Sequence, residues 1–161
     1  MKTSRSVGYG LLAACYVAQH QEKDFITSQG ISAEYGIPLE YLLKVMQSMV
    51  RGNIFHSKRG PRGGFKLARS VDKISIQQII EAIDGPSRTD LSLSELPAAG
   101  KIGENLQASF DEATDAHSEV LAGVFLSKFI SVEPVKATHA KKSKSKKKSK
   151  SKSKKEQVSS S

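Results

Sequence analysis

The sequence predicts a mainly α-helical fold with one small β-hairpin, followed by a long C-terminal helix and a disordered tail. Three observations support this prediction. Apolar residues recur at helical spacing in several segments of the first 130 residues. Two short segments on either side of a glycine-rich run have the alternation of a hairpin. The last part, 135–161, consists largely of Lys and Ser, so it has too few apolar groups to offset the entropy of ordering.

Three helices are expected to open the chain. The first spans 4–19, where apolar residues recur every three or four positions. A short second helix spans 29–35 and ends at Gly36, a residue suited to the left-handed conformation of a helix end. Pro38 then opens a third helix that runs to about Arg51. The apolar residues of this third helix that are expected to face inward are Leu42, Val45, Met46, Met49 and Val50.

A β-hairpin is expected next, with strands over 54–58 and 65–68 joined by the turn 59–64. The first strand is expected to place Ile54, His56 and Lys58 on one face and Phe55 and Ser57 on the other. The turn is rich in glycine, which removes side chains where a backbone must approach another molecule. Five cations lie in or beside this hairpin: Lys58, Arg59, Arg62, Lys66 and Arg69.

The rest of the chain is expected to form an arm and a tail. A fourth helix ends at Gly85-Pro86 and completes a first domain, 1–86. A loop over 87–103 follows, then a long helix from about Glu104 and a short terminal element within 104–134, before the tail, 135–161. The residues of this region expected to form a homodimer interface are Leu106, Phe110, Ala113, His117, Val120, Leu121 and Val124.

Composition excludes several classes of protein. The longest apolar stretch is far below the roughly 20 residues that span a bilayer, so no membrane association is expected. One cysteine, Cys15, cannot supply a cysteine-based metal site, and the four histidines lack metal-ligand spacing. No nucleophile–base pair or phosphate-binding loop is found. We therefore expect a cytoplasmic, nucleoid-associated protein that is not an enzyme and needs no metal or cofactor.

The charge distribution points to a polyanionic partner. The chain carries 25 Lys and Arg against 16 Asp and Glu, a net charge of +9. Ten of the lysines lie in 141–155, whereas 1–136 contains equal numbers of basic and acidic residues. Because the excess charge is concentrated in the tail, the tail is expected to bind DNA without sequence preference. A role limited to solubility is the alternative.

Three helices followed by a hairpin is also the order of a winged helix-turn-helix, in which the third helix enters the DNA major groove. Here that helix presents hydrogen-bonding and cationic groups opposite its apolar face, which suits base edges and phosphates. Double-stranded DNA is therefore the expected partner. The residues expected to contact it are Ser28, Tyr41, Lys44, Gln47, Ser48, Arg51, Lys58, Arg59, Gly60, Pro61, Arg62, Gly63, Gly64 and Lys66.

The hairpin residues 59–68, Arg-Gly-Pro-Arg-Gly-Gly-Phe-Lys-Leu-Ala, closely resemble the wing signature of the Rrf-two family of IscR-like transcriptional regulators. The Tyr-Leu pair at 41–42, the segment 76–86 and, more weakly, 120–130 are also similar to that family. The resemblance covers about 1–130. It implies a homodimer with crossed long helices on an imperfect palindrome, with Arg59 in the minor groove.

The chain departs from the family pattern in three places. Many members carry three cluster-binding cysteines where 87–103 has none, so a regulator without an iron–sulfur cluster is expected. Leu43 replaces an acidic base-reading residue of some relatives, so their target sequence does not transfer. Asn53 replaces the glycine usual after the third helix, and Asn also tolerates positive φ.

Three functions remain open on the sequence alone. The first is a sequence-specific regulator, a repressor that blocks promoter access. The second is a structural nucleoid protein, in which the tail dominates binding. The third is a regulator controlled by a protein partner; an unidentified small-molecule or protein effector is included among the expected partners.

Overall fold

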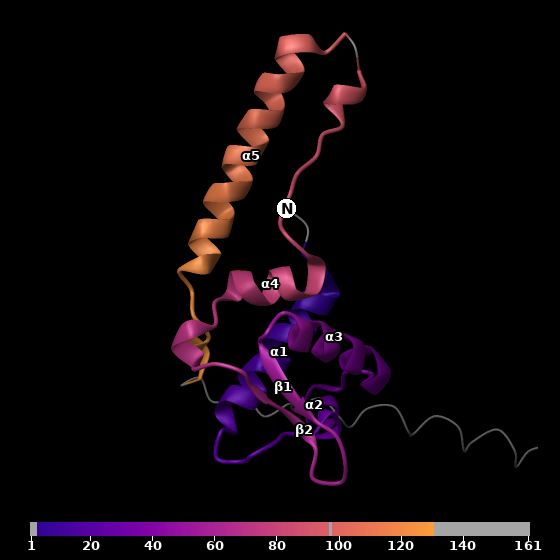
Figure 1. Ribbon diagram of the computed structural model, residues 1–161, viewed down its shortest axis with the longest axis vertical. Helices are drawn as coiled ribbons and strands as arrows, with labels where there is room; N and C mark the ends of the chain where they lie inside the picture. The colour runs from indigo at the N-terminus through magenta and orange to yellow at the C-terminus, as the bar shows by residue number, and fades with distance from the viewer. Residues whose placement is uncertain (1–2, 97, 131–161) are drawn as a thin grey trace, which may run out of the picture.

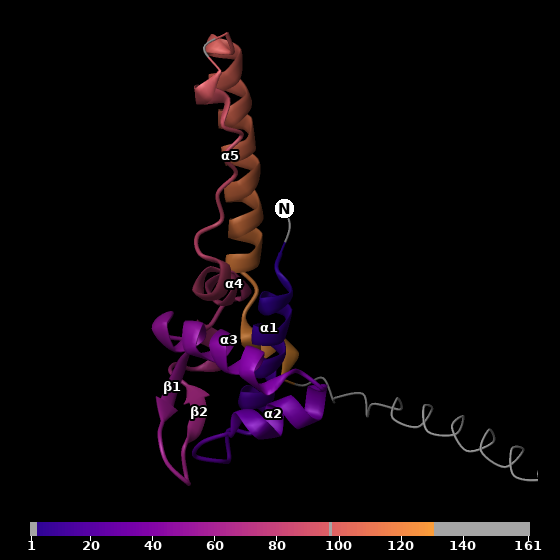
Figure 2. The same cartoon turned by 90° about the vertical axis from the view of Figure 1, so that its right-hand side faces the viewer.

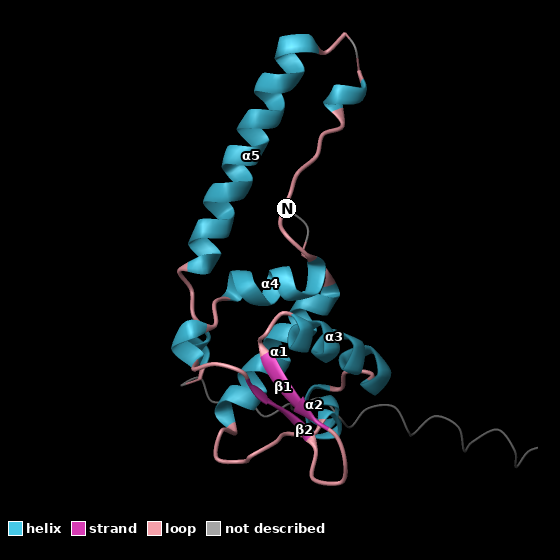
Figure 3. Cartoon of the chain, viewed as in Figure 1, coloured by secondary structure: helices cyan, strands magenta, loops and turns pink. Residues whose placement is uncertain are grey.

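Five α-helices and a two-stranded hairpin make up most of the described residues, 3–96 and 98–130, in this computed structural model (Figures 1 and 3). The hairpin and four of the helices form a body from which the fifth helix, α5, projects as an arm (Figures 1 and 2). The structure therefore confirms the predicted fold class, while the predicted disordered tail lies outside the described residues. The α-helices are α1 (Arg5–Gln19), α2 (Ser28–Tyr35), α3 (Leu39–Arg51), α4 (Ile76–Asp84) and α5 (Gly100–Ala122).

Side-chain caps begin three of these helices. The Ser4 hydroxyl accepts a hydrogen bond from the third residue of α1, and Thr27 does the same for α2. Ser75 and Gln78 cap α4 reciprocally, each side chain accepting from the other's backbone N–H. Such caps satisfy N–H groups that the first helical turn cannot pair. Gly36, at φ +64°, ends α2 as predicted.

The core lies where α1, α3 and α4 pack together under the hairpin. Four of the five residues expected to face inward from α3 are buried, whereas Val50 is only half-buried and lines a groove described below. The fully buried side chains are almost entirely aliphatic, as the composition predicts. The largest of them are Phe55, Ile31, Leu42, Met46, Met49, Ile54, Ile74, Ile79, Leu126 and Val7.

Strands β1 (Phe55–Lys58) and β2 (Gly64–Leu67) pair antiparallel, with Phe55 opposite Leu67. The expected alternation is wrong at Ile54, which is as fully buried as Phe55. Ile54 lies before β1, in the corner that follows Asn53 at φ +55°, and its N–H donates to the Met49 carbonyl at 2.8 Å. Its side chain is therefore directed by the corner into the core.

The arm begins earlier than predicted. Helix α5 starts at Gly100, inside the region 87–103 that was expected to be a loop, and a single 3-10 turn (Leu93–Glu95) precedes it. Glycines in a sequence usually indicate a loop, but Gly103 has a packing role within this helix. A β-carbon at Gly103 would lie 2.9 Å from that of Ala99 and 3.3 Å from that of Leu93. Helix α5 and the turn at Leu93 can approach this closely only because Gly103 has no β-carbon.

The chain returns from the arm to the body. A 3-10 turn, Leu126–Phe129, is attached to the segment before α4 by a hydrogen bond of 2.9 Å, which the Leu126 N–H donates to the Ile74 carbonyl. The Leu126 side chain is fully buried in the core. In space this terminal element packs with residues 1–86. No helix among the described residues has the length and apolar character that crossing a bilayer demands.

Candidate nucleic-acid interface

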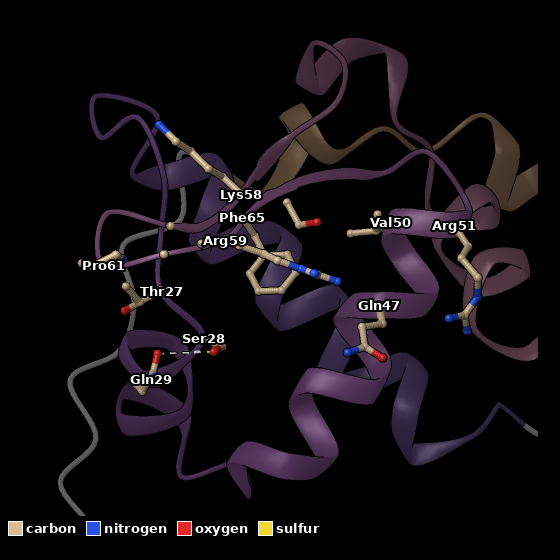
Figure 4. A pocket seen from close by; sticks show the side chains of 14 residues that line it. Thr27, Ser28, Gln29, Gln47, Val50, Arg51, Lys58, Arg59, Pro61 and Phe65 are labelled. Carbon is tan, nitrogen blue, oxygen red and sulfur yellow. Dashed lines mark hydrogen bonds between the residues drawn. The ribbon is translucent and has the colours of Figure 1, made fainter.

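A groove of about 800 Å³ lies between α3 and the hairpin (Figure 4). The beginning of α2, the second half of α3 and the turn of the hairpin form its walls. None of the described lining residues is acidic. The groove thus combines cationic, amide and hydroxyl groups on one concave surface. Its lining residues are Thr27, Ser28, Gln29, Gln47, Val50, Arg51, Ser57, Lys58, Arg59, Gly60, Pro61, Gly63, Gly64 and Phe65.

Helix α3 presents the polar face that the sequence predicts. Lys44, Gln47 and Arg51 are exposed along it, and Ser48 is half-buried. The Arg51 guanidinium donates a 2.8 Å hydrogen bond to the Ser48 hydroxyl. That bond places a cation at the C-terminal end of α3, beside the groove. An amide and a guanidinium one turn apart can together contact a base edge and a phosphate.

Arg59 crosses the groove from the opposite wall. Figure 4 shows its side chain extending from the hairpin toward Gln47 and α3. Because its backbone belongs to the hairpin turn and Gln47 to α3, the groove brings two predicted contact residues together from different elements. A ligand in the groove would meet both.

Lys58 and Lys66 are directed elsewhere. Their ammonium groups lie 5.3 and 5.1 Å from the centroid of the Phe25 ring, and Figure 4 shows the Lys58 side chain pointing away from the groove. Lys66 also pairs with the exposed Asp24 at 3.7 Å, an interaction worth little at a solvated surface. These two lysines therefore gather on the outer face of the wing, over one aromatic ring.

Two glycines allow the wing to form. A β-carbon at Gly63 would lie 2.2 Å from the Lys58 carbonyl oxygen. Gly64 has φ +151°, and a β-carbon there would lie 2.3 Å from the Ile26 carbonyl oxygen. This close approach lets Ile26 and Phe65 exchange two backbone hydrogen bonds of 2.9 and 2.8 Å, which attach the base of the wing to the body.

Several predicted contact residues lie outside the groove walls: Tyr41, Lys44, Ser48, Arg62 and Lys66. Tyr41 is 41% exposed but is turned toward α1, where its hydroxyl lies 2.6 Å from that of Ser6 and its ring packs edge-on against Tyr9. Ser28 does line the groove, yet it is only 6% exposed and its hydroxyl donates to Gln29 at 3.4 Å.

Sequence reasoning missed five lining residues: Thr27, Gln29, Val50, Ser57 and Phe65. Thr27 and Gln29 flank the start of α2, so a signal was available, because the N-terminal end of a helix next to a recognition helix is a common phosphate contact. Phe65 gave no such signal, since an aromatic residue in a strand is ordinarily read as core.

Metal-ligating side chains do not converge in the part of the chain that the structure describes, where no group of three or more His, Cys, Asp or Glu could hold an ion. Cys15, the one cysteine of the sequence, lies half-buried in α1. Burial raises the pKa of its thiol, which disfavours the thiolate that metals and oxidants require.

The sequence model of one family, described as Rrf2, iron-dependent transcriptional regulator, matches residues 3–131. A protein of Aquifex aeolicus named as an HTH-type transcriptional regulator is 27% identical over 133 residues, which are 81% of this chain and 92% of that protein. The HTH-type transcriptional regulator IscR of Vibrio vulnificus is 33% identical over 84 residues, 52% of this chain and 50% of that protein.

Solved structures share the fold. CymR (YrzC), named the global cysteine regulator of B. subtilis, superposes with a TM-score of 0.63 at 24% identity, covering 81% of this chain and 97% of that one. T. potens IscR superposes with a TM-score of 0.60 at 23% identity, and the superposition covers 81% of this chain and 86% of that one. Since the family model spans nearly all the described residues, this chain belongs to the Rrf2 family and is a DNA-binding transcriptional regulator.

Proposed function

We propose that this protein is a sequence-specific repressor that acts in the cytoplasm as a homodimer, without an iron–sulfur cluster. The observation that carries the proposal is the groove between α3 and the wing, in which Arg59 extends toward Gln47 and Arg51 lines the same wall as Gln47. An α-helix fits the major groove of B-DNA, and a neighbouring arginine can enter the minor groove. We assign base reading to Gln47 and Arg51, and minor-groove contact to Arg59.

Four other predicted contact residues are assigned to the DNA backbone. Lys44 and Arg62 are exposed beside the groove, where they suit phosphates on either side of the bases. Lys58 and Lys66, on the outer face of the wing, suit the phosphates that flank the minor groove. Such contacts fix the register of a protein on the duplex without reading sequence. A repressor of this kind acts by occupying promoter DNA.

The homodimer is supported by an apolar stripe on α5 that nothing in the described chain covers. Leu106 and Phe110 are 47% and 46% exposed, and Val120 is 69% exposed. Along the stripe the spacing alternates between four and three residues, the repeat that pairs helices in coiled coils. The α5 apolar stripe consists of Leu106, Phe110, Ala113, His117 and Val120, whereas Val124, which was also predicted for the interface, lies beyond the end of α5.

The opposite face of α5 is acidic, which leaves the apolar stripe as the face suited to a second copy. By helical periodicity five exposed carboxylates lie across the helix from the stripe, and like charges there disfavour close pairing. Leu121 and Val124 are half-buried near the body. The five carboxylates are Glu104, Asp111, Glu112, Asp115 and Glu119.

We propose that the chain holds no iron–sulfur cluster, although its family is described as iron-dependent. Such clusters bind through several thiolates, and the only thiol of this sequence is half-buried in α1. The residues present therefore do not fit the group. Protein purified without oxygen is expected to lack stoichiometric iron and acid-labile sulfide; finding both, with cluster absorbance, would contradict the proposal.

The tail is proposed to add affinity for any DNA. Its ten lysines over 141–155 release counterions where they meet phosphates. Deleting 137–161 is expected to lower affinity for all sequences alike and to flatten the slope of log K against log salt by up to about nine. A full-length control with these lysines replaced by serine should behave as the deletion does. An unchanged slope in both proteins would show that the tail does not bind.

Competition binding tests the sequence-specific function as a whole. With the site found by genome-wide occupancy mapping, a specific regulator is expected to prefer that site over random DNA by roughly 10³-fold or more. A structural nucleoid protein would bind both alike, and that result would overturn the proposal. The chain without 137–161 serves as the control, because a contribution that is equal for all sequences should leave this preference unchanged.

A further inference from the structure

A second cavity, of about 370 Å³, lies where three elements meet: the end of α3, the segment that leaves the hairpin, and α4. It shares no lining residue with the DNA groove. Its volume is at the lower end of the roughly 300–1,000 Å³ typical of small-molecule sites. The residues that line it are Gly52, Asn53, Arg69, Gln78, Glu81 and Ala82.

Arg69 contributes a cationic side chain to this cavity. One terminal nitrogen of its guanidinium donates to the Gln78 amide oxygen at 3.3 Å. Its Nε is buried and has no hydrogen-bond partner. Because Nε is buried, a ligand in the cavity would meet the terminal nitrogens of the guanidinium instead. The planar fork of a guanidinium is best matched by a carboxylate, which accepts two parallel hydrogen bonds.

Glu81 supplies the opposite charge. Its carboxylate accepts a 2.9 Å hydrogen bond from the Gln77 amide and is otherwise exposed at the cavity. Although Arg69 and Glu81 line one cavity, they form no ion pair within 4.0 Å in the described structure. The space between them thus has a cationic wall and an anionic wall. A molecule that carries both charges close together complements it better than a simple anion, which Glu81 would repel.

We propose that this cavity binds a small zwitterion of the α-amino acid class. The carboxylate would bind the Arg69 guanidinium through its terminal nitrogens, and the ammonium group would bind Glu81. The amides of Asn53 and Gln78 lie in the same wall and offer further polar contacts, while Ala82 leaves room for a side chain. This inference goes beyond DNA binding and does not depend on it.

The cavity adjoins a contact between the DNA-facing helix and the arm. A β-carbon at Gly52, which ends α3, would lie 2.4 Å from that of Ala82, so α3 packs closely against α4 here. From the same helix α4, the Gln77 amide donates to the Ser118 hydroxyl of α5 at 3.3 Å. A ligand bound by Arg69 and Glu81 would therefore contact α4, the helix that packs against both α3 and α5.

Isothermal titration calorimetry of the full-length protein with the standard α-amino acids tests the proposal. At least one is expected to bind, whereas its α-carboxamide, its N-acetyl derivative and inorganic phosphate bind far more weakly. Arg69→Gln and Glu81→Gln are each expected to weaken binding by roughly tenfold or more, as the loss of a charged hydrogen bond predicts. Glu81→Gln keeps an acceptor for Gln77.

Two matched controls are available on exposed residues that do not line the cavity: Lys73→Gln and Asp72→Asn should leave the dissociation constant unchanged. Should Arg69→Gln fail to fold by circular dichroism, Arg69→Lys, which retains the charge but lacks the planar fork of the guanidinium, is expected to weaken binding as well. The proposal is overturned if no amino acid binds at millimolar concentration, or if both cavity variants bind normally. Phosphate binding that Glu81→Gln strengthens would also overturn it, since that defines a simple anion site.

Discussion

Phe110→Asp is expected to convert the protein to a monomer and to lower its affinity for an operator by roughly a hundredfold or more, the gain usually conferred by joining two binding units. Phe110 lies at the middle of the exposed α5 apolar stripe, 46% exposed in a single chain. A carboxylate buried in a helix–helix contact at this point would be unpaired, which is costly. A dimer reads two half-sites spaced by the DNA repeat, and a monomer reads one.

Sedimentation equilibrium gives the mass, which should fall to the 17.5 kDa of one chain, and fluorescence anisotropy gives the affinity. Ala108→Asp is the matched control, because Ala108 is exposed on the acidic face of the same helix. It adds the same charge and should leave both quantities unchanged. A variant at Phe110 that stays dimeric would show that α5 is not the interface. A wild-type protein that sediments as a monomer would exclude the homodimer altogether.

Local signals in the sequence were sufficient for most of the fold. The caps at Ser4, Thr27 and Ser75 involve only residues within one helical turn, so signals of this kind are local to the sequence. The start of α5 could not be predicted, because Gly100 and Gly103 are glycines that ordinarily favour loops. The role of Gly103 becomes clear only when α5 is packed against the turn at Leu93.

The kinds of residue that form the candidate site could be predicted from the sequence, but the directions of their side chains could not. The sequence predicts the polar face of α3, and the groove walls include nine of the predicted contact residues. It could not show that Lys58 and Lys66 lie over Phe25, because that ring comes from a segment more than 30 residues earlier in the chain. Arg69, grouped by sequence with the wing cations, proved to face α4, where its guanidinium donates to Gln78. Directions of long side chains depend on packing between distant segments.

Arg59→Ala is expected to lower specific DNA binding by roughly 1–3 kcal/mol, which is about 5- to 150-fold, with a much smaller effect on random DNA. Arg59 is the wing cation whose side chain extends across the groove toward Gln47 (Figure 4). A guanidinium inserted in a narrow minor groove is attracted by the strong negative potential there, which depends on base sequence. Removing it should therefore reduce discrimination as well as affinity.

Arg62→Ala provides the comparison, because Arg62 carries the same charge on the same turn but is exposed outside the groove walls. If Arg62 contacts only phosphate, its loss should weaken binding to operator and random DNA equally and reduce the salt slope by about one. Gel shifts on both duplexes across a salt series separate the two roles. An equal loss on both duplexes for Arg59→Ala would show that Arg59 positions the wing without reading sequence, and the specificity would then have to come from α3 alone.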